Sequence, residues 1–344
     1  MDKNTVYEFD YDLPEELIAQ DPLPDRDQSR MLVLNRFTGE IDHAMFSQLP
    51  EYLNAEDVLV FNDTKVLPAR FWGYKKETGG RVEFLLLREI EYNKWDVLCS
   101  PGRKARPGDV FLFKGEDLEA YILEMNTSGS RTVLFKTPGH LKDIFSRIGQ
   151  MPLPPYIKQT LNNPERYQTI FAAKEGSAAA PTAGLHFTPR VIKRLKEKNI
   201  DKTFLTLHVG LGTFRPVKTA YIKNHKMHLE YYNLTDASAQ LINRAKDKGS
   251  KVVAVGTTTC RVLESLSSEY GRVLSGEGET DLFIYPGYQF RVVDAMITNF
   301  HLPRSTLLMM ICAFAGKDKV FHAYREAIEN QYRFYSFGDC MLIL

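Results

Sequence analysis

The feature that most constrains the fold is a series of short, closely spaced strand-like segments in the first half of the chain. Turns such as Thr78-Gly79-Gly80 and Pro107-Gly108 separate these segments and leave no room for helices between them. This spacing is typical of a small antiparallel barrel or sandwich. The expected strands are residues 81–87, 94–98, 109–113, 118–123 and 131–135.

Beyond residue 150 the pattern changes to alternating helices and strands, which indicates an α/β domain with some parallel pairing. Residues 188–198 predict an amphipathic helix, with Thr188 as its N-cap and Pro189 at its first helical position. Residues 237–248 predict another helix, which leads into an apolar strand at residues 251–255. Further expected elements are strands at 203–209, 281–287 and 294–303 and a helix from Cys260 onward.

Residues 58–61 form an apolar strand of the same buried type just before the strand-rich segment. The economical interpretation is one α/β domain interrupted by an insertion. We therefore predict an α/β large domain of residues 1–63 plus 150–344 and, inserted into it, a small antiparallel β-barrel domain of residues 64–149. No period of 20 to 50 residues repeats, which argues against solenoids and propellers.

Composition limits the function classes without selecting one. The 344 residues are 44% hydrophobic, and 44 basic against 43 acidic residues give a net charge of +1, which does not by itself indicate a polyanionic partner. Four cysteines without C-x-x-C spacing indicate free thiols in a reducing compartment. The start of the chain does not resemble a secretory signal, and its longest apolar run is far below the ~20 residues that cross a bilayer. A soluble, cytoplasmic protein with no membrane partner is expected.

Several common catalytic motifs do not occur in the sequence. G-x-G-x-x-G after a strand, G-x-x-x-x-G-K-[ST], H-E-x-x-H and G-x-S-x-G are all missing, which counts against dinucleotide redox chemistry, P-loop chemistry and zinc hydrolysis. His225 and His228 have a spacing that binds metals on helices, but the sequence supplies no evident third and fourth ligand. We expect no metal site.

The most unusual segment is EGSAAAPTAGLHF at residues 175–187. Its alanines favour a helix, yet Pro181 and Gly184 interrupt it, which predicts a loop whose small side chains allow a ligand close to the backbone. A packing joint with a hydrogen-bonded histidine is an equally good interpretation. The polar side chains that this segment offers to a ligand are Glu175, Ser177, Thr182 and His186.

Other polar side chains follow apolar strands, where ligand sites of α/β proteins lie. A strand, a glycine and three threonines that open a helix form a candidate site for an anion or a ribose, although one threonine would also serve as a simple N-cap. The remaining groups would either line a cleft or satisfy turn backbone. These candidates are His208, Arg215, Thr257, Thr258, Thr259, Asn299 and His301, with Ser305 nearby.

Two basic sets are candidates for RNA contact, because arginines hold phosphates and aromatic rings stack on unpaired bases. Arg103, Lys104 and Arg106 lie in a proline- and glycine-containing turn of the predicted barrel. Arg325 and Arg333 lie among aromatic residues near the C-terminus, and at least half of those rings are expected to belong to the core. The charged run at 193–202 predicts a solvated helix face.

Taken together, these segments resemble the S-adenosylmethionine:tRNA ribosyltransferase-isomerases of queuosine biosynthesis. The resemblance extends over nearly the whole chain, in at least ten long blocks in the same order. Among the blocks that carry it are DVLVFNDTKVLPAR at 57–70, GSAAAPTAGLHFT at 176–188, HVGLGTFRPV at 208–217, VVAVGTTTCRVLE at 252–264, TNFHLPRSTLLMM at 298–310 and RFYSFGDCMLI at 333–343.

The resemblance implies an enzyme that uses S-adenosylmethionine as a ribosyl donor rather than a methyl donor. The ribosyl group is transferred to 7-aminomethyl-7-deazaguanine (preQ1) at the wobble position of tRNA and isomerised, which gives epoxyqueuosine-tRNA and releases adenine and methionine. S-adenosylmethionine is then a co-substrate, and no prosthetic group, metal or obligate protein partner is implied. The implied fold is an α/β domain with an inserted β-barrel.

This chemistry defines the roles that candidate residues would fill. The sulfonium acidifies the ribose 5′-carbon, so a base must lie beside it, and Glu175, His186 and His208 are the candidates. The methionine carboxylate needs hydrogen-bond donors, which the three threonines from Thr257 to Thr259 or Arg215 would supply. The further substrate contacts expected are Ser177, Thr182, Asn299 and His301.

Two other classes of protein fit part of the pattern. A small-molecule ribosyl- or nucleotide-transferring enzyme that never binds RNA is one, and salt-sensitive tRNA binding would count against it. A non-catalytic RNA-binding module is the other. It would account for the basic and aromatic segments but not for polar residues gathered at strand ends.

Overall fold

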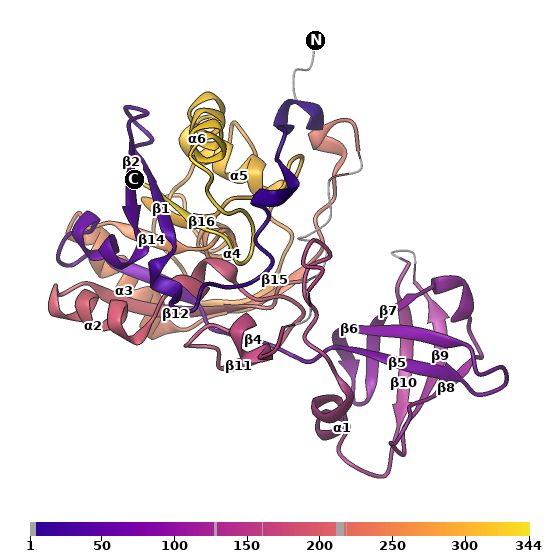
Figure 1. The fold of residues 1–344 in the computed structure, drawn as a ribbon. Coiled ribbons are helices and arrows are strands. Elements are labelled where there is room, and N and C mark those ends of the chain that lie inside the picture. Colours follow the sequence, from indigo (N-terminus) through magenta and orange to yellow (C-terminus); the bar gives the residue numbers. More distant parts are fainter. Residues whose placement is uncertain (1–4, 127–128, 160, 211–216, 218) are drawn as a thin grey trace. The chain divides into compact units, whose positions relative to one another are not determined.

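Parallel strands with almost fully buried residues form the centre of a nine-stranded mixed sheet (Figure 1). The structure, a computed structural model, describes residues 5–126, 129–159, 161–210, 217 and 219–344. In spatial order the strands are β15 (Gly276–Thr280), β13 (Glu230–Leu234), β12 (Asp201–Leu207), β3 (Val58–Asn62), β14 (Val252–Val255), β16 (Ala295–Asn299), β17 (Cys340–Ile343), β1 (Arg30–Leu34) and β2 (Ile41–Met45). Strands β12, β3, β14 and β16 run parallel to one another.

The central strands are apolar on both sides because each face of the sheet has its own core. On β3, Val58 and Val60 belong to one core, while Leu59 and Phe61 belong to the other. The first core includes side chains from α3 (Asp236–Asp247), α4 (Thr257–Ser265), α5 (Thr306–Ala315) and α6 (Lys317–Glu329). The second includes side chains from α2 (Pro189–Glu197) and the 3₁₀ helix Phe46–Tyr52.

The smaller unit is a closed six-stranded antiparallel barrel. Buried phenylalanines fill it, and α1 (Leu141–Ile148) places Phe145 against them, with ring centroids 5.0 Å from Phe71 and 5.2 Å from Phe135. Around the barrel the strands are β10 (Arg131–Lys136), β7 (Lys94–Ser100), β6 (Arg81–Glu91), β5 (Arg70–Lys75), β8 (Val110–Leu112) and β9 (Glu119–Met125). The predicted fold class, an α/β domain with an antiparallel barrel, is confirmed.

Most predicted elements lie within a few residues of the observed ones. Thr188 caps α2 by accepting from the Val191 amide at 3.3 Å, as its side chain predicts. The strand expected at residues 281–287 is wrong, because no strand is assigned there although all of these residues are described. Apolar side chains of that segment pack on the first core, and the Leu282 carbonyl accepts a hydrogen bond from Arg261 instead of from a neighbouring strand. The apolar pattern of this segment therefore indicated burial and not an extended strand.

The chain divides into two compact units. The larger comprises Met1–Thr64, Pro154–Lys174 and Ala180–Leu344, and the smaller comprises Lys65–Leu153 and Glu175–Ala179. A two-stranded sheet of β4 (Thr64–Val66) and β11 (Lys174–Ser177) lies where the chain passes from one unit to the other. We propose that the units are separate domains with limits near residues 64 and 149. No helix within the described residues is long and apolar enough to span a membrane.

Candidate functional site

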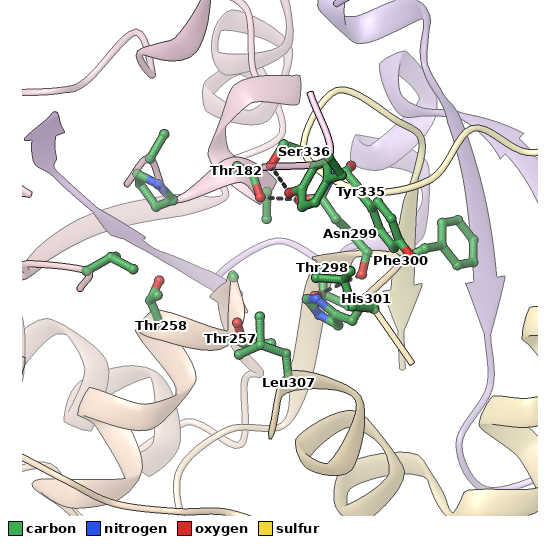
Figure 2. A pocket seen from close by; sticks show the side chains of 17 residues that line it. Thr182, Thr257, Thr258, Thr298, Asn299, Phe300, His301, Leu307, Tyr335 and Ser336 are labelled. Carbon is green, nitrogen blue, oxygen red and sulfur yellow. Dashed lines mark hydrogen bonds between the residues drawn. The ribbon is translucent and has the colours of Figure 1, made fainter. Parts of the chain in front are cut away.

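A cavity in the larger unit lies at the carboxyl ends of β12, β14 and β16, where α/β proteins bind ligands (Figure 2). Its empty space is about 570 Å³ including the open mouth. None of the described residues that line it is charged. The lining residues with polar or aromatic side chains are Tyr156, Thr182, Thr257, Thr258, Thr298, Asn299, Phe300, His301, Tyr335 and Ser336.

Asn299, the last residue of β16, holds one wall of the cavity together through its side-chain amide. The amide nitrogen donates to the Tyr335 carbonyl at 3.2 Å and to His186 Nε2 at 3.1 Å, and the amide oxygen accepts from the Thr182 hydroxyl at 2.8 Å. A backbone carbonyl only accepts, so the Tyr335 contact fixes which end of the amide is nitrogen. Nε2 of His186 therefore accepts, and its Nδ1–H donates to the Ser29 hydroxyl at 2.7 Å.

His186 is consequently a neutral histidine whose two ring nitrogens are both occupied. Burial lowers the pKa of His186 to about 3, and the positive charges of Arg26 and Arg333 act in the same direction. The structure brings His186 to the edge of the cavity, where Asn299 lies between its ring and the lining surface. This arrangement favours a positioning function for His186, and its predicted function as a catalytic acid or base stays a prediction.

The lowered pKa of His186 predicts a loss of stability in acid. In the unfolded chain the His186 ring binds a proton below its ordinary pKa of 6.5. In the native chain the ring stays neutral until about pH 3. The native state is therefore destabilised progressively as the pH falls from 6.5 towards about 3, by about 1.4 kcal/mol per pH unit. Urea unfolding at pH 7, 6 and 5 should show a shallower pH dependence for His186→Asn, by about one proton. Ser29→Ala, which keeps the histidine, is the control, and an unchanged slope in His186→Asn would contradict the assignment.

His301 differs from His186 because one of its ring nitrogens is unused. Its Nε2 lies 2.7 Å from the Thr298 hydroxyl, and that hydroxyl donates to the Asn299 carbonyl. In the tautomer in which Nε2–H donates to that hydroxyl, Nδ1 carries the lone pair. Nδ1 has no hydrogen-bond partner within the part of the chain that the structure describes. Burial lowers the pKa of His301 to about 3, which keeps the ring neutral.

The three threonines lie at the N-terminus of α4, as the sequence predicts, but they do not all face the cavity. Thr257 and Thr258 line it. Thr259 turns away and donates its hydroxyl proton to the Val255 carbonyl at 2.8 Å. The sequence placed the helix start at Cys260, whereas α4 begins at Thr257 because Gly256 acts as its N-cap.

The predicted residues Glu175, Ser177 and His208 are not among the residues that line this cavity. Glu175 belongs to the smaller unit, where it is exposed and its carboxylate is 3.1 Å from the Lys65 ammonium. Ser177 is buried in that unit and donates to the Ala179 carbonyl at 2.7 Å. Nδ1 of His208 is hydrogen-bonded to the Thr64 hydroxyl at 2.8 Å, and burial lowers the pKa of the His208 ring. Arg215 lies outside the described residues.

Aromatic residues near the C-terminus are buried rather than exposed. Tyr332, Phe334 and Tyr335 all belong to the first core, and Tyr335 also lines the cavity, where its ring centroid is 4.7 Å from that of Tyr156. Tyr156 could not be predicted as a site residue, because nothing in the sequence shows that it meets a residue so far along the chain. Arg333 donates to the Asp21 carbonyl, whereas Arg325 is exposed on α6.

The side chains of the basic turn of the barrel are exposed, and a buried arginine fixes the backbone of this turn. Arg103, Lys104 and Arg106 are all exposed. The buried Arg131 donates to the Gly102 carbonyl at 2.9 Å and to the Ala105 carbonyl at 2.8 Å, which fixes the backbone of the turn. Within the described ranges, no group of three or more histidine, cysteine or acidic side chains is arranged to hold a metal ion.

The fold defines an α/β protein with a separate closed barrel and a cavity at its strand ends, and comparisons identify its family. A model of the family described as "Queuosine biosynthesis protein" matches residues 6–343. Proteins named S-adenosylmethionine:tRNA ribosyltransferase-isomerase from Natranaerobius thermophilus and Thermoanaerobacter sp. are 54% and 51% identical over 337 residues, covering 98% of this chain and 98% and 99% of theirs. A crystal structure of S-adenosylmethionine tRNA ribosyltransferase from Thermotoga maritima has a TM-score of 0.57 at 39% identity, covering 98% of this chain and all of that one.

The chain therefore belongs to the queuosine biosynthesis protein family.

Proposed function

We propose that the chain transfers and isomerises the ribosyl group of S-adenosylmethionine onto the aminomethyl group of preQ1 in tRNA, releasing adenine and methionine. The observation that carries the proposal is the uncharged, aromatic cavity at the strand ends of a chain whose close relatives are named for this reaction. The aromatic side chains of Tyr156 and Tyr335 on the wall suit a flat adenine and a sulfonium cation.

Within this proposal His301 is the best-placed proton acceptor for the ribose 5′-carbon. It is the only histidine that lines the cavity, and its Nδ1 lone pair has no protein partner in the described part of the chain. Thr182 and Asn299 would hold hydroxyl groups of the ribose, since both lie on the same wall (Figure 2). Glu175, His186 and His208 stay candidates for the base, with less support from their surroundings.

The direct test is to incubate the protein with S-adenosylmethionine and tRNA that carries preQ1, and then to analyse the nucleosides by mass. Formation of epoxyqueuosine together with free adenine and methionine is the expected result. Methylated nucleosides would instead mean that S-adenosylmethionine serves as a methyl donor. Turnover of S-adenosylmethionine with the free base alone would favour a small-molecule enzyme that does not need RNA.

For the RNA, we propose that the basic turn on the barrel contacts tRNA phosphates. Replacing Arg103, Lys104 and Arg106 by alanine should weaken tRNA binding and flatten its salt dependence by roughly 0.9 log units per lost contact on duplex, and by less on single strands. The measurement is the dissociation constant for tRNA across a salt series.

A matched control removes three other exposed positive charges, those of Lys193, Lys196 and Lys202. This second triple variant should bind tRNA like the parent, because the solvated face of α2 and the residues after it are not expected to touch RNA. Equal losses in the two triple variants would show only a general effect of net charge. If the triple variant of the barrel turn bound tRNA with unchanged affinity and unchanged salt dependence, the turn would not contact tRNA. Arg325 and Arg333 would then be the remaining candidates for the RNA contact.

A further inference from the structure

We propose that the N-terminus of α4 binds the carboxylate of the methionyl part of S-adenosylmethionine, with the Thr258 hydroxyl as the side-chain donor. This assignment rests on the proposed function and selects one of the two donor sets that the sequence left open.

The backbone at the start of α4 is free to bind an anion. Cys260 is the first amide of the helix to be bonded, to the Gly256 carbonyl at 3.2 Å. The amides of Thr257, Thr258 and Thr259 have no acceptor within the described ranges. Gly256, the N-cap, has φ of 94° and no side chain with which to cap them. Unpaired amides at a helix N-terminus, together with the helix dipole, favour negative charge.

Thr258 supplies an independent observation that points to a ligand. Its hydroxyl oxygen is buried and has no hydrogen-bond partner among the residues that the structure describes, and the residue is only 8% exposed. The side chain lines the cavity (Figure 2) and belongs to the first turn of α4, where the free amides are. A buried hydroxyl without a partner destabilises a protein, and an acceptor brought by a ligand would remove that cost. Thr259 cannot do the same, because its hydroxyl is already bonded to Val255.

The surroundings favour a carboxylate over a phosphate of the RNA. Protein contacts to RNA phosphates usually include lysine or arginine, and neither occurs among the described residues that line the cavity. The empty space of the cavity is about 570 Å³ including its open mouth. A singly charged carboxylate matches this space and a set of uncharged donors, and it is one end of a molecule whose rings and sulfonium suit the aromatic wall.

The experiment compares two ligands on matched variants by calorimetry. The ligands are S-adenosylmethionine and its decarboxylated analogue. Thr258→Val removes the hydroxyl at nearly constant volume, and Thr258→Ser keeps a hydroxyl. Thr306→Val is the control, because Thr306 has the same 8% exposure in the first turn of α5, does not line the cavity, and belongs to a helix that Ser305 already caps.

Thr258→Val should weaken S-adenosylmethionine binding by about 10- to 100-fold, the effect of losing a hydrogen bond to a charged group. Thr258→Ser and Thr306→Val should bind it within a few-fold of the parent. The decarboxylated analogue should bind the parent more weakly and should not distinguish the parent from Thr258→Val. Thr258→Asp puts a carboxylate at the helix N-terminus, where the dipole tolerates it, and should exclude S-adenosylmethionine while the protein stays folded.

Equal losses for both ligands in Thr258→Val would overturn the carboxylate assignment and leave the proposed function intact. A loss of tRNA affinity with unchanged S-adenosylmethionine affinity would also overturn it and would indicate an RNA phosphate. If the parent itself bound no S-adenosylmethionine, the proposed function would fail before the subsite was tested. Far-UV circular dichroism of every variant separates these outcomes from misfolding, and Thr258→Asp still tests the subsite if Thr258→Val does not fold.

Discussion

Replacing His301 by alanine is expected to lower turnover by roughly 10²- to 10⁴-fold, the usual effect of removing a positioned acid or base. The ring lines the cavity, Nε2 is held by Thr298 at 2.7 Å, and Nδ1 is the nitrogen left for a ligand. Because the backbone amide and carbonyl of His301 are bonded to Tyr324 and Tyr11, the main chain should keep its place in the variant. Single-turnover nucleoside analysis gives the rate, and calorimetry gives the S-adenosylmethionine affinity.

Two conservative variants separate the functions of the two ring nitrogens. The amide of His301→Asn can reach the position of Nδ1, whereas that of His301→Gln reaches toward Nε2 and Thr298. If Nδ1 only donates or accepts a hydrogen bond, His301→Asn should recover part of the rate and His301→Gln should not. If Nδ1 takes a proton, neither should recover it. His322→Ala, on an exposed surface of α6, is the matched control. If His301→Ala turned over within a few-fold of the parent, His301 would be excluded as the catalytic base. His208 and Glu175 would then be the next candidates to test.

The largest loss of stability is expected from Glu230→Gln, by about 3–5 kcal/mol in the free energy of unfolding. Glu230 and Arg261 form an ion pair in which both side chains are almost fully buried. The substitution keeps the shape but leaves the buried guanidinium without its counter-charge, while its contacts to backbone carbonyls, such as that of Leu282 at 3.1 Å, remain. It also weakens the contact from the Gly210 amide, which donates to Glu230 at 2.7 Å.

Urea unfolding of three variants tests this expectation. Glu277→Gln removes an exposed carboxylate from the neighbouring strand β15 and should change the unfolding free energy by less than about 1 kcal/mol. The double variant Glu230→Leu, Arg261→Met should recover much of the loss, because an apolar pair carries no desolvation penalty. A loss below about 1 kcal/mol in Glu230→Gln would mean that water or a nearby group already compensates Arg261.

Elements that depend on local pattern could be predicted from the sequence. The barrel strands followed from alternating apolar residues between glycine and proline turns, and α2 followed from Thr188 and Pro189. The prediction of a strand at residues 281–287 was wrong for a physical reason, because apolar side chains indicate burial but do not determine the backbone conformation. Burial of this segment comes from packing on a core built by distant residues.

The arrangement of the candidate site could be predicted only in part, because its contacts join distant residues. His186 and Asn299 are both in the predicted set, yet their hydrogen bond spans 113 positions, and it determines that the His186 ring is occupied. Tyr156 and Ser336 are 180 positions apart and share a 2.7 Å hydrogen bond on the same wall. Glu175 is a predicted site residue that the fold places elsewhere, since its exposed carboxylate pairs with Lys65 in the smaller unit.

The position of β17 has a consequence for how this chain is made on the ribosome. Strands β1 and β2 come first in synthesis, but their only link to the other sheet strands described is β17, which pairs Met31 with Cys340. Until β17 has been synthesised and has left the exit tunnel, the apolar strand β1 lacks this partner, and nascent chains in that state are prone to aggregate. A chain truncated before residue 340 would therefore carry an open sheet edge at β1. We expect such products to depend on chaperones.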